Sequence, residues 1–493
     1  MIFRIHRTFT CFILACLSFS CSFTKVSGQD WRQWRGPSRN GTLADSPRLR
    51  DQLPANGLSP TWISEANLMG ASGWSSPVVA AGRVFVYLHR QHPKPGLQAP
   101  SAQYPMLTNE QKGTMAPQAI DAYEELRIEE QMTRLRGYFD WTDDVVCLDA
   151  SNGKTLWNHS RASSATRWRQ SSTPVFDAGR LCYLGADRAM ISLDAETGQI
   201  TWNTPLPFIP KTDEPTVSSP VVIDGAICVS VGKLLAYDLE SGNIIWQGDP
   251  ETTRSIYSSP TIWKSDWGSY AIAHVAKGKT ICVEPRTGLV RWTIETFAER
   301  SSPTVVGNLL LTYGGSRKGG LRCYRMSHDG AENVWMNQRL NDAGSSPTVV
   351  DGLVFVQGER NLICVDLKSG ETQWSEPINA TDSRYTSPVS ADGKVYFASE
   401  GLLCFQATAK RMTPVFDAGL VLDNRLVAKD EIRNRLKIDT LEETSEGRLQ
   451  AQQLWHAKVI NPGPLRCATP ALADGKLYLR TNSRLLCFDL KRE

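Results

Sequence analysis

The chain has 493 residues, of which 41% are hydrophobic and 21% charged, a composition typical of a folded globular protein. Length alone suggests about three domains, although one repeat architecture can absorb several hundred residues. The 54 basic and 51 acidic residues nearly balance, which argues against nucleic acid as a partner and gives no support for binding to an anionic membrane.

Residues 1–28 have the features of a secretory signal peptide. A basic start at residues 4–7 precedes an apolar run at 8–19, and the small residues at 26–28 suit signal peptidase. The apolar run is shorter than the ~20 residues of a membrane-spanning helix, so a transmembrane anchor is the less favoured alternative. The text around Cys16 loosely resembles a lipoprotein cleavage box, which leaves lipidation at Cys16 or Cys21 open. We expect an exported protein of the periplasm or cell envelope, or a secreted one. Its mature chain would have no transmembrane span and 51 residues of each charge.

Nine of the 12 cysteines lie beyond this signal, so a monomer, which we expect, has at least one unpaired cysteine. Cys182 and Cys228 lie in second strands of the repeats described below. Six others share one repeat position: Cys147, Cys282, Cys323, Cys364, Cys404 and Cys487. Equivalent positions on different repeats should be too far apart to bridge. We interpret these cysteines as small buried apolar residues, not as disulfides or metal ligands.

Residues 29–57 are predicted to form an N-terminal arm, since Gly, Pro and an Asn-Gly pair oppose a regular helix there. Trp31 and Trp34 lie among interleaved arginines. They either form a recognition surface or plug a hydrophobic seam at the edge of the fold, and we favour the plug.

A Ser-Ser-Pro strand start then recurs eight times, with Ser-Thr-Pro, Thr-Ser-Pro and Ala-Thr-Pro as variants at three of the positions. Five of the seven spacings between its prolines are 40–46 residues, the period of four-stranded propeller blades. Proline is tolerated at the first residue of a strand because no ladder hydrogen bond is lost. Asp-Gly pairs such as Asp351-Gly352 follow four residues later and predict tight hairpin turns. The prolines are Pro77, Pro174, Pro220, Pro260, Pro303, Pro347, Pro388 and Pro470.

The second half of each repeat has three regular features. An acidic residue ends the third strand, a glycine lies in the turn that follows, and a tryptophan lies in the fourth, outer strand. A tryptophan stacked between blades buries a large area, and its N–H can reach a backbone carbonyl. Eight tryptophans fit: Trp62, Trp157, Trp202, Trp246, Trp292, Trp335, Trp374 and Trp455. The last repeat has none of its own, so the strand around Thr61-Trp62 should complete the final blade and close the ring. The fold class is therefore all-β, an eight-bladed propeller over residues 58–493.

Two insertions interrupt the spacing. The first, about 90–140, has helical spacing that predicts a helix over 117–137. The second, about 409–450, is placed between the third and fourth strands of the seventh blade. It is either an irregular extra hairpin, which we favour, or a degenerate ninth blade.

Ser-Ser-Pro strands combined with Leu-Asp-Ala-x-x-Gly-x-x-x-Trp units resemble the PQQ-binding-like β-propeller repeat family. That family includes quinoprotein dehydrogenases and BamB-like assembly lipoproteins. The opening at 31–41 looks like the start of exported bacterial members without assigned activity. The resemblance covers residues 31–493 and is specific for fold, not for function.

Under this resemblance one function is a PQQ-dependent oxidoreductase holding the quinone with calcium. The sequence lacks the family's adjacent cysteine pair and a haem-attachment motif. His89 and His92 are three residues apart in a sequence typical of a loop. They could bind a metal ion as a pair, but we favour two histidines in a solvent-exposed loop. We therefore favour an exported, non-catalytic scaffold, for which no cofactor and no metal are expected. It would bind envelope proteins, an anionic small ligand or a glycan; carbohydrate binding stays open as a further alternative.

The residues just before each Ser-Ser-Pro should surround one mouth of the central channel. Arginines suit carboxylates, and aromatic rings suit planar or sugar faces, which makes this mouth the candidate ligand site. In the plainer interpretation the arginines pair with local acids and pack the channel. The candidates are Trp74, Arg169, Arg254, Tyr257, Arg300, Arg384, Tyr385 and Arg466, with Glu299 beside them.

Overall fold

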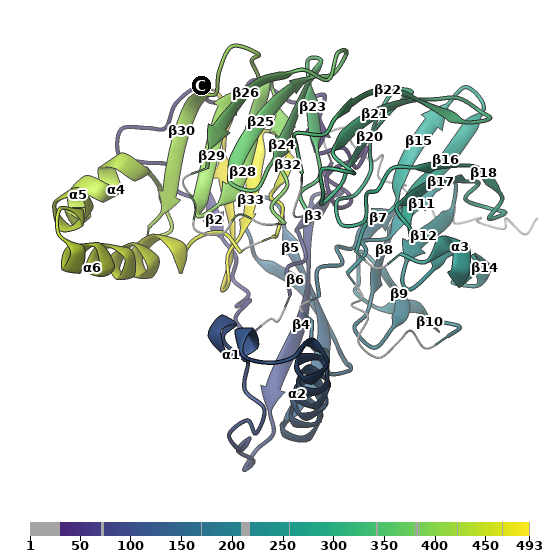
Figure 1. Ribbon diagram of the computed structural model, residues 1–493, viewed down its shortest axis with the longest axis horizontal. Coiled ribbons are helices and arrows are strands. Elements are labelled where there is room, and N and C mark those ends of the chain that lie inside the picture. The colour runs from purple at the N-terminus through teal and green to yellow at the C-terminus, as the bar shows by residue number, and fades with distance from the viewer. Residues whose placement is uncertain are drawn as a thin grey trace, which may run out of the picture.

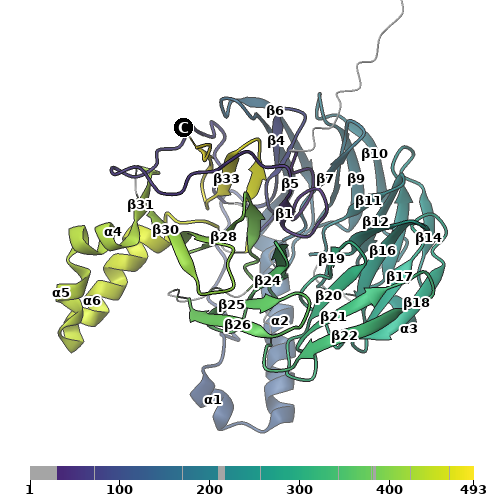
Figure 2. The same ribbon diagram turned by 90° about the horizontal axis from the view of Figure 1, so that it is seen from above.

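The computed structural model describes residues 30–70, 73–168, 170–208, 217–255, 257–341, 344–378, 380, 383, 385–421, 423–465 and 467–492. The proposed signal peptide lies outside these residues. Eight sheets, whose blade strands pair antiparallel, stand around a common axis, as Figures 1 and 2 show from two directions. The predicted eight-bladed, all-β propeller is confirmed. Within the described residues, no helix combines the length and the apolar character needed to cross a membrane.

The inner strands line the axis, and each pairs outward with a second strand. The inner strands are β3 (Val78–Ala80), β7 (Val175–Asp177), β11 (Val221–Ile223), β15 (Thr261–Ser265), β19 (Thr304–Val306), β23 (Thr348–Val350), β27 (Val389–Ala391) and β32 (Ala471–Ala473). The second strands are β4 (Arg83–Pro93), β8 (Arg180–Leu184), β12 (Ala226–Ser230), β16 (Gly268–Val275), β20 (Leu309–Tyr313), β24 (Leu353–Gln357), β28 (Lys394–Ser399) and β33 (Lys476–Arg480). Asp351 and Gly352 between β23 and β24 both have positive φ, 48° and 76°, as a two-residue hairpin turn requires.

The third and fourth strands complete each blade. The third strands are β5 (Phe139–Asp149), β9 (Ala189–Asp194), β13 (Leu234–Asp238), β17 (Lys279–Val283), β21 (Leu321–Met326), β25 (Asn361–Asp366), β29 (Gly401–Gln406) and β34 (Leu485–Asp489). The outer strands are β6 (Thr155–Ala162), β10 (Ile200–Pro205), β14 (Ile244–Gln247), β18 (Val290–Glu295), β22 (Ala331–Asn337), β26 (Thr372–Pro377), β30 (Thr413–Leu420) and β2 (Trp62–Ile63).

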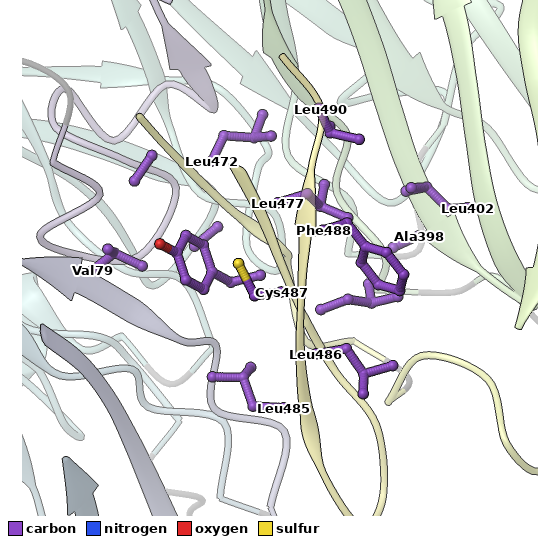
Figure 3. Close-up of a cluster of buried hydrophobic side chains, with 14 of the residues drawn as sticks. Val79, Ala398, Leu402, Leu472, Leu477, Leu485, Leu486, Cys487, Phe488 and Leu490 are labelled. Atoms are coloured by element: carbon purple, nitrogen blue, oxygen red, sulfur yellow. The ribbon is translucent and has the colours of Figure 1, made fainter. Parts of the chain in front are cut away.

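The N-terminal strand closes the ring, as predicted. β2 pairs antiparallel with β34, with Trp62 opposite Cys487. The eighth blade packs its apolar residues against both neighbours, including Val79 of the first blade and Leu402 of the seventh (Figure 3). The eighth blade is therefore completed by a strand from the other end of the chain, which covers an edge that solvent would otherwise reach.

The predicted tryptophan position is confirmed in seven blades. The Trp62 indole N–H donates to the Ala150 carbonyl at 3.1 Å, and the ring lies on Gly153 of the first blade. Gly153 has a φ of +73°, and a Cβ there would come within 2.5 Å of the indole. In the seventh blade the prediction is wrong, because Phe416 takes the position opposite Cys404 and Trp455 ends helix α6 (Ser445–Trp455).

The cysteines also behave as predicted. All nine beyond the signal are free thiols, and eight are buried. Burial raises the pKa of each of these eight to about 12. Six of them lie in third strands and two, Cys182 and Cys228, in second strands, where they act as small apolar residues.

The structure explains why a hydroxyl residue recurs at the second position of each Ser-Ser-Pro, which the sequence alone did not explain. At seven positions the backbone N–H of this second residue donates to the hydroxyl of the equivalent residue in the next blade, at 2.9–3.0 Å. The bond from Thr469 to Ser76 joins the last blade to the first. We call this set the hydroxyl belt: Ser76, Thr173, Ser219, Ser259, Ser302, Ser346, Ser387 and Thr469.

Replacing Ser259 with alanine should lower the free energy of unfolding by about 1–3 kcal/mol, because the buried Ser219 N–H loses its partner. Ser259→Thr keeps the hydroxyl, as Thr173 and Thr469 do at the same position, and should stay near the wild type. Urea unfolding followed by tryptophan fluorescence measures both. Equal losses for the two variants would mean that side-chain volume, not the hydrogen bond, matters at this position.

The first insertion contains helices α1 (Asn109–Gly113) and α2 (Pro117–Tyr138), so the helix predicted over 117–137 is confirmed. The insertion extends from the paired ends of β4 and β5 and projects away from the ring (Figure 1). The loop before α2 is hydrogen-bonded to this helix. The Glu130 carboxylate of α2 accepts hydrogen bonds from the backbone N–H groups of Gln103 and Tyr104, at 2.6 and 2.7 Å.

The second insertion differs from the prediction. It begins after the fourth strand, because β30 follows β29 directly and pairs with it. A hairpin joins β30 to β31 (Leu426–Ala428), as favoured above, and no ninth blade forms among the described residues. Unpredicted helices follow: α4 (Lys429–Leu436), α5 (Ile438–Glu442), α6 and the π-helical turn η1 (His456–Ile460).

Candidate functional site

The two ends of the channel differ. We call the face at which the inner strands begin the mouth face, and the opposite face, with the Asp-Gly turns, the arm face. Since strands alternate in direction, the connections from each outer strand to the next inner strand all lie on the mouth face. The ends of β4 and β5 lie there too, so the α1–α2 insertion projects from the mouth face.

The candidates that belong to the described residues lie on the mouth face, but only some of them reach solvent. Tyr257 and Tyr385 are 49% and 40% exposed, and Arg300 and Glu299 are exposed as well. Trp74 and Arg254 are half-buried. Arg169, Arg384 and Arg466 lie outside the described residues, so the convergence of the five arginines stays a prediction.

The ring of Tyr385 is held in position by backbone geometry. Tyr385 adopts a left-handed φ of 65°, and its ring lies against Gly344, which has a φ of +116°. A Cβ on Gly344 would come within 2.2 Å of the tyrosine ring. Gly344 and Tyr385 each precede a Ser/Thr-Ser-Pro, so the ring of Tyr385 lies against the connection of the neighbouring blade at the mouth.

Other residues of the mouth face escaped the sequence analysis. Trp168 is 45% exposed, and the guanidinium of Arg167 lies 4.4 Å from the centre of its ring. A pocket of about 300 Å³ lies between the β22–β23 connection and the β24–β25 turn. Its lining includes the exposed Arg339 and Arg360 and the apolar Leu340. Because these residues come from different connections, no local motif marks the pocket.

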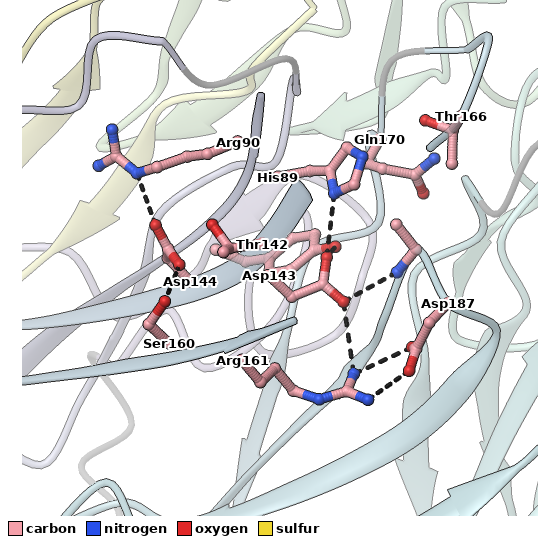
Figure 4. Close-up of polar contacts among 12 residues, drawn as sticks. His89, Arg90, Thr142, Asp143, Asp144, Ser160, Arg161, Thr166, Gln170 and Asp187 are labelled. Carbon is pink, nitrogen blue, oxygen red and sulfur yellow. Dashed lines mark hydrogen bonds and ion pairs between the residues drawn. The ribbon is translucent and has the colours of Figure 1, made fainter. Parts of the chain in front are cut away.

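A buried polar network anchors the base of the insertion (Figure 4). The Asp143 carboxylate accepts the Tyr87 hydroxyl at 2.7 Å and contacts His89 Nδ1 at 3.1 Å. Its second oxygen accepts the Ala186 N–H and the Arg161 guanidinium, which also pairs with Asp187 of the second blade. The network therefore fixes the first blade against the second.

His89 and Asp143 form a pair that resembles a catalytic dyad, yet both side chains are fully buried. A substrate cannot reach them in this arrangement, in which Asp143 joins the first blade to the second. The expectation of a loop around His89 and His92 is wrong, because both lie in β4, where residues three apart point to opposite faces. His92 contacts Thr142 instead. The described residues contain no group of three or more His, Cys, Asp or Glu side chains that could hold a metal ion.

The N-terminal arm crosses the arm face. Trp31 is fully buried and bridges to Val79 of β3, which confirms the predicted plug for Trp31, whereas Trp34 is only half-buried. The strand β1 (Thr42–Leu43) runs parallel to β27 at the end of that inner strand. Between these points Arg35 and Arg39 enter the channel and are fully buried. Gly41, with a φ of +81°, allows this, since a Cβ there would lie 2.8 Å from the Arg35 guanidinium.

The surroundings of the arm in the channel do not suit calcium. Calcium takes six to eight oxygen ligands, usually including carboxylates. The arm instead brings two guanidinium groups, which donate to hydroxyl and carbonyl oxygens. Two buried guanidinium groups repel a divalent cation, so this part of the channel is unsuited to calcium.

The model of the family described as outer membrane protein assembly factor BamB matches residues 142–376 and 267–492. This chain belongs to that family. It is 24% identical over 355 residues to the outer membrane protein assembly factor BamB of Yersinia pestis, covering 69% of this chain and 78% of the relative. It is 25% identical over 301 residues to BamB of Moranella endobia (strain PCIT), covering 58% of this chain and 66% of the relative.

The fold extends beyond BamB. The crystal structure of a quinohemoprotein alcohol dehydrogenase from Comamonas testosteroni is similar with a TM-score of 0.52, covering 94% of this chain and 81% of that one. The identity is 11%, so this likeness shows the propeller fold alone. The predicted PQQ-like, BamB-like repeat family is confirmed.

Proposed function

We propose that this protein is an exported, non-catalytic propeller of the cell envelope that binds a protein partner across its mouth face. The observation that carries this proposal is the concentration of exposed Tyr257, Tyr385, Trp168 and Arg300 there, beside a projecting helical insertion. Aromatic and arginine side chains are enriched in protein interfaces.

Two further observations support a scaffold. The most catalytic-looking pair, His89 and Asp143, is closed to solvent. The relatives from Yersinia pestis and Moranella endobia carry the name of an outer membrane assembly factor, which supports a partner in the envelope. A signal peptide over residues 1–28 would supply the export route, and amino-terminal sequencing of the mature protein tests it.

A site-specific photocrosslinker tests the binding face in the native host. Placed at Tyr257 or Tyr385, it should give a discrete crosslinked product. Placed at Trp267, which is 52% exposed at the β15–β16 turn on the arm face, it should give none. A crosslink from Trp267 alone would move the partner to the other face.

Adding quinone and calcium to the purified protein tests the alternative function, a quinone-dependent oxidoreductase. Saturable binding of the cofactor to the purified protein, with reduction of a dye by alcohols or sugars, would overturn the non-catalytic proposal. Binding of glycans without crosslinks to protein would replace the protein partner by a carbohydrate.

A further inference from the structure

Two arginines of the arm place positive charge inside the channel. Arg35 donates to Thr304 Oγ1 at 3.1 Å, and to the carbonyls of Asn40, Ser346 and Pro347. Arg39 donates to the carbonyls of Pro220 and Ser219, at 2.7 and 3.1 Å. The partners outside the arm belong to the third, fifth and sixth blades, so the two side chains reach different parts of the channel wall.

These hydrogen-bond acceptors are all neutral oxygens. Neither Arg35 nor Arg39 has an ion pair with a carboxylate among the described residues, whereas Arg32 of the same arm pairs with Asp177 at 3.1 Å. Within the same residues, the Nε–H group of each buried arginine also lacks a hydrogen-bond acceptor. Burying an unpaired charge and an unsatisfied donor is unfavourable, and in this channel both occur twice.

Burial lowers the pKa of Arg35 and of Arg39 to about 9, and the charge of Arg35 acts on Arg39 in the same direction. Both groups therefore stay protonated at neutral pH. The guanidinium carbons lie 5.7 and 5.6 Å from the centre of the Trp34 ring. The ring attracts both cations through its quadrupole but carries no charge to neutralise them.

We propose that the channel holds a small inorganic anion, of the chloride or phosphate class, bound by the Nε–H groups of Arg35 and Arg39 beside Trp34. Such an ion supplies the missing acceptor and offsets part or all of the charge of the two guanidiniums, depending on its own charge. Guanidinium groups bind anions through charge-assisted hydrogen bonds of this kind. The arm is then a lid that closes the channel over an ion.

Diffraction from wild-type crystals grown in bromide tests the site directly. We expect an anomalous peak within about 3.5 Å of Nε of Arg35 or Arg39. Crystals grown in phosphate without halide should show a tetrahedral density there if the site prefers oxyanions. Density that refines as water in both conditions would overturn the proposal.

Thermal unfolding tests the same site in solution. At constant ionic strength, replacing gluconate by chloride or phosphate should raise the unfolding temperature saturably, by about 2 °C or more. The variant R35Q/R39Q should lose this rise, while R32Q, on the same arm but paired outside the channel, should keep it. A rise of equal size in all three proteins would reflect a general salt effect and contradict the proposal. If R35Q/R39Q does not fold, R39K, which keeps the charge but removes the Nε–H, takes its place and should reduce the rise.

Discussion

Trp62→Ala should lower the free energy of unfolding by about 3–5 kcal/mol, the usual cost of removing a buried large aromatic side chain. Trp62 is 7% exposed, packs near Tyr478 and donates its indole N–H to Ala150 of the first blade. β2 has only two residues, so little else holds it against β34. We expect the variant to lose the closing strand and to expose the edge of β34, which should promote aggregation. Chemical denaturation with light scattering measures both effects.

Trp202→Ala is the matched control, because Trp202 occupies the same position within a blade whose strands are continuous in sequence and donates to Leu239. It should lose comparable stability without aggregating at low denaturant concentration. If both variants aggregate alike, ring closure by β2 has no special importance. If neither loses stability, the tryptophans are not the supports between blades that their packing indicates.

We expect this protein to unfold at only moderately alkaline pH. Eight buried thiols have a pKa raised from 9.0 to about 12, so the folded state keeps their protons between these values while the unfolded state releases them. Stability is therefore complete below about pH 9 and falls as the pH rises toward 12. Each thiol contributes about 1.4 kcal/mol per pH unit, and the eight together contribute on the order of 10 kcal/mol per unit. This slope is comparable with the whole stability of a typical domain, so we expect unfolding near pH 10–11.

Other buried groups modify this slope. The pKa of Tyr237 is raised by burial and adds loss of stability above pH 10. Arg35, Arg39 and Arg480 act in the opposite sense, because burial lowers the pKa of each to about 9 and their deprotonation favours the folded state above it. Urea titrations at half-unit steps from pH 8 to 11 measure the sum. Cys282→Ala should make the decline shallower by about 1.4 kcal/mol per pH unit, and an unchanged slope in this variant would contradict the assignment to thiols.

The repeats made the propeller predictable because the same local rules act eight times. Ser-Ser-Pro, Asp-Gly and the turn glycine each fix a backbone geometry, so their spacing predicts the blades and the closing strand. The count failed where Phe416 replaced a tryptophan, since any large flat side chain fills that space. Trp455 then supplied the missing eighth tryptophan by coincidence, from a helix. The helices of the second insertion have no such periodic signal, because few of their residues are buried.

The candidate site was less predictable than the fold. Position before a Ser-Ser-Pro identifies residues of the mouth face, and Tyr257 and Tyr385 are exposed there. The position of a residue in the sequence does not predict which side chains contact one another, because the mouth face is built from connections of separate blades. The pocket beside Arg339 and Arg360 illustrates this. The burial of Arg35 and Arg39 was unexpected for a similar reason: their partners are backbone carbonyls of distant blades, and arginine is rarely buried without an acid.

The pairing of β2 with β34 sets the order in which the chain can finish folding as it is synthesised. Residues 31–63, which are made early, contact strands near residues 390 and 487, which are made late. The arm and the closing strand must therefore stay unpaired until nearly the whole chain has been made. During this interval their apolar side chains, Trp31 and Trp62 among them, have no place in the ring. Assembly of the protein therefore depends on the time taken to synthesise the chain as well as on stability, and a chain that stops before residue 485 would leave β2 without a strand to pair with.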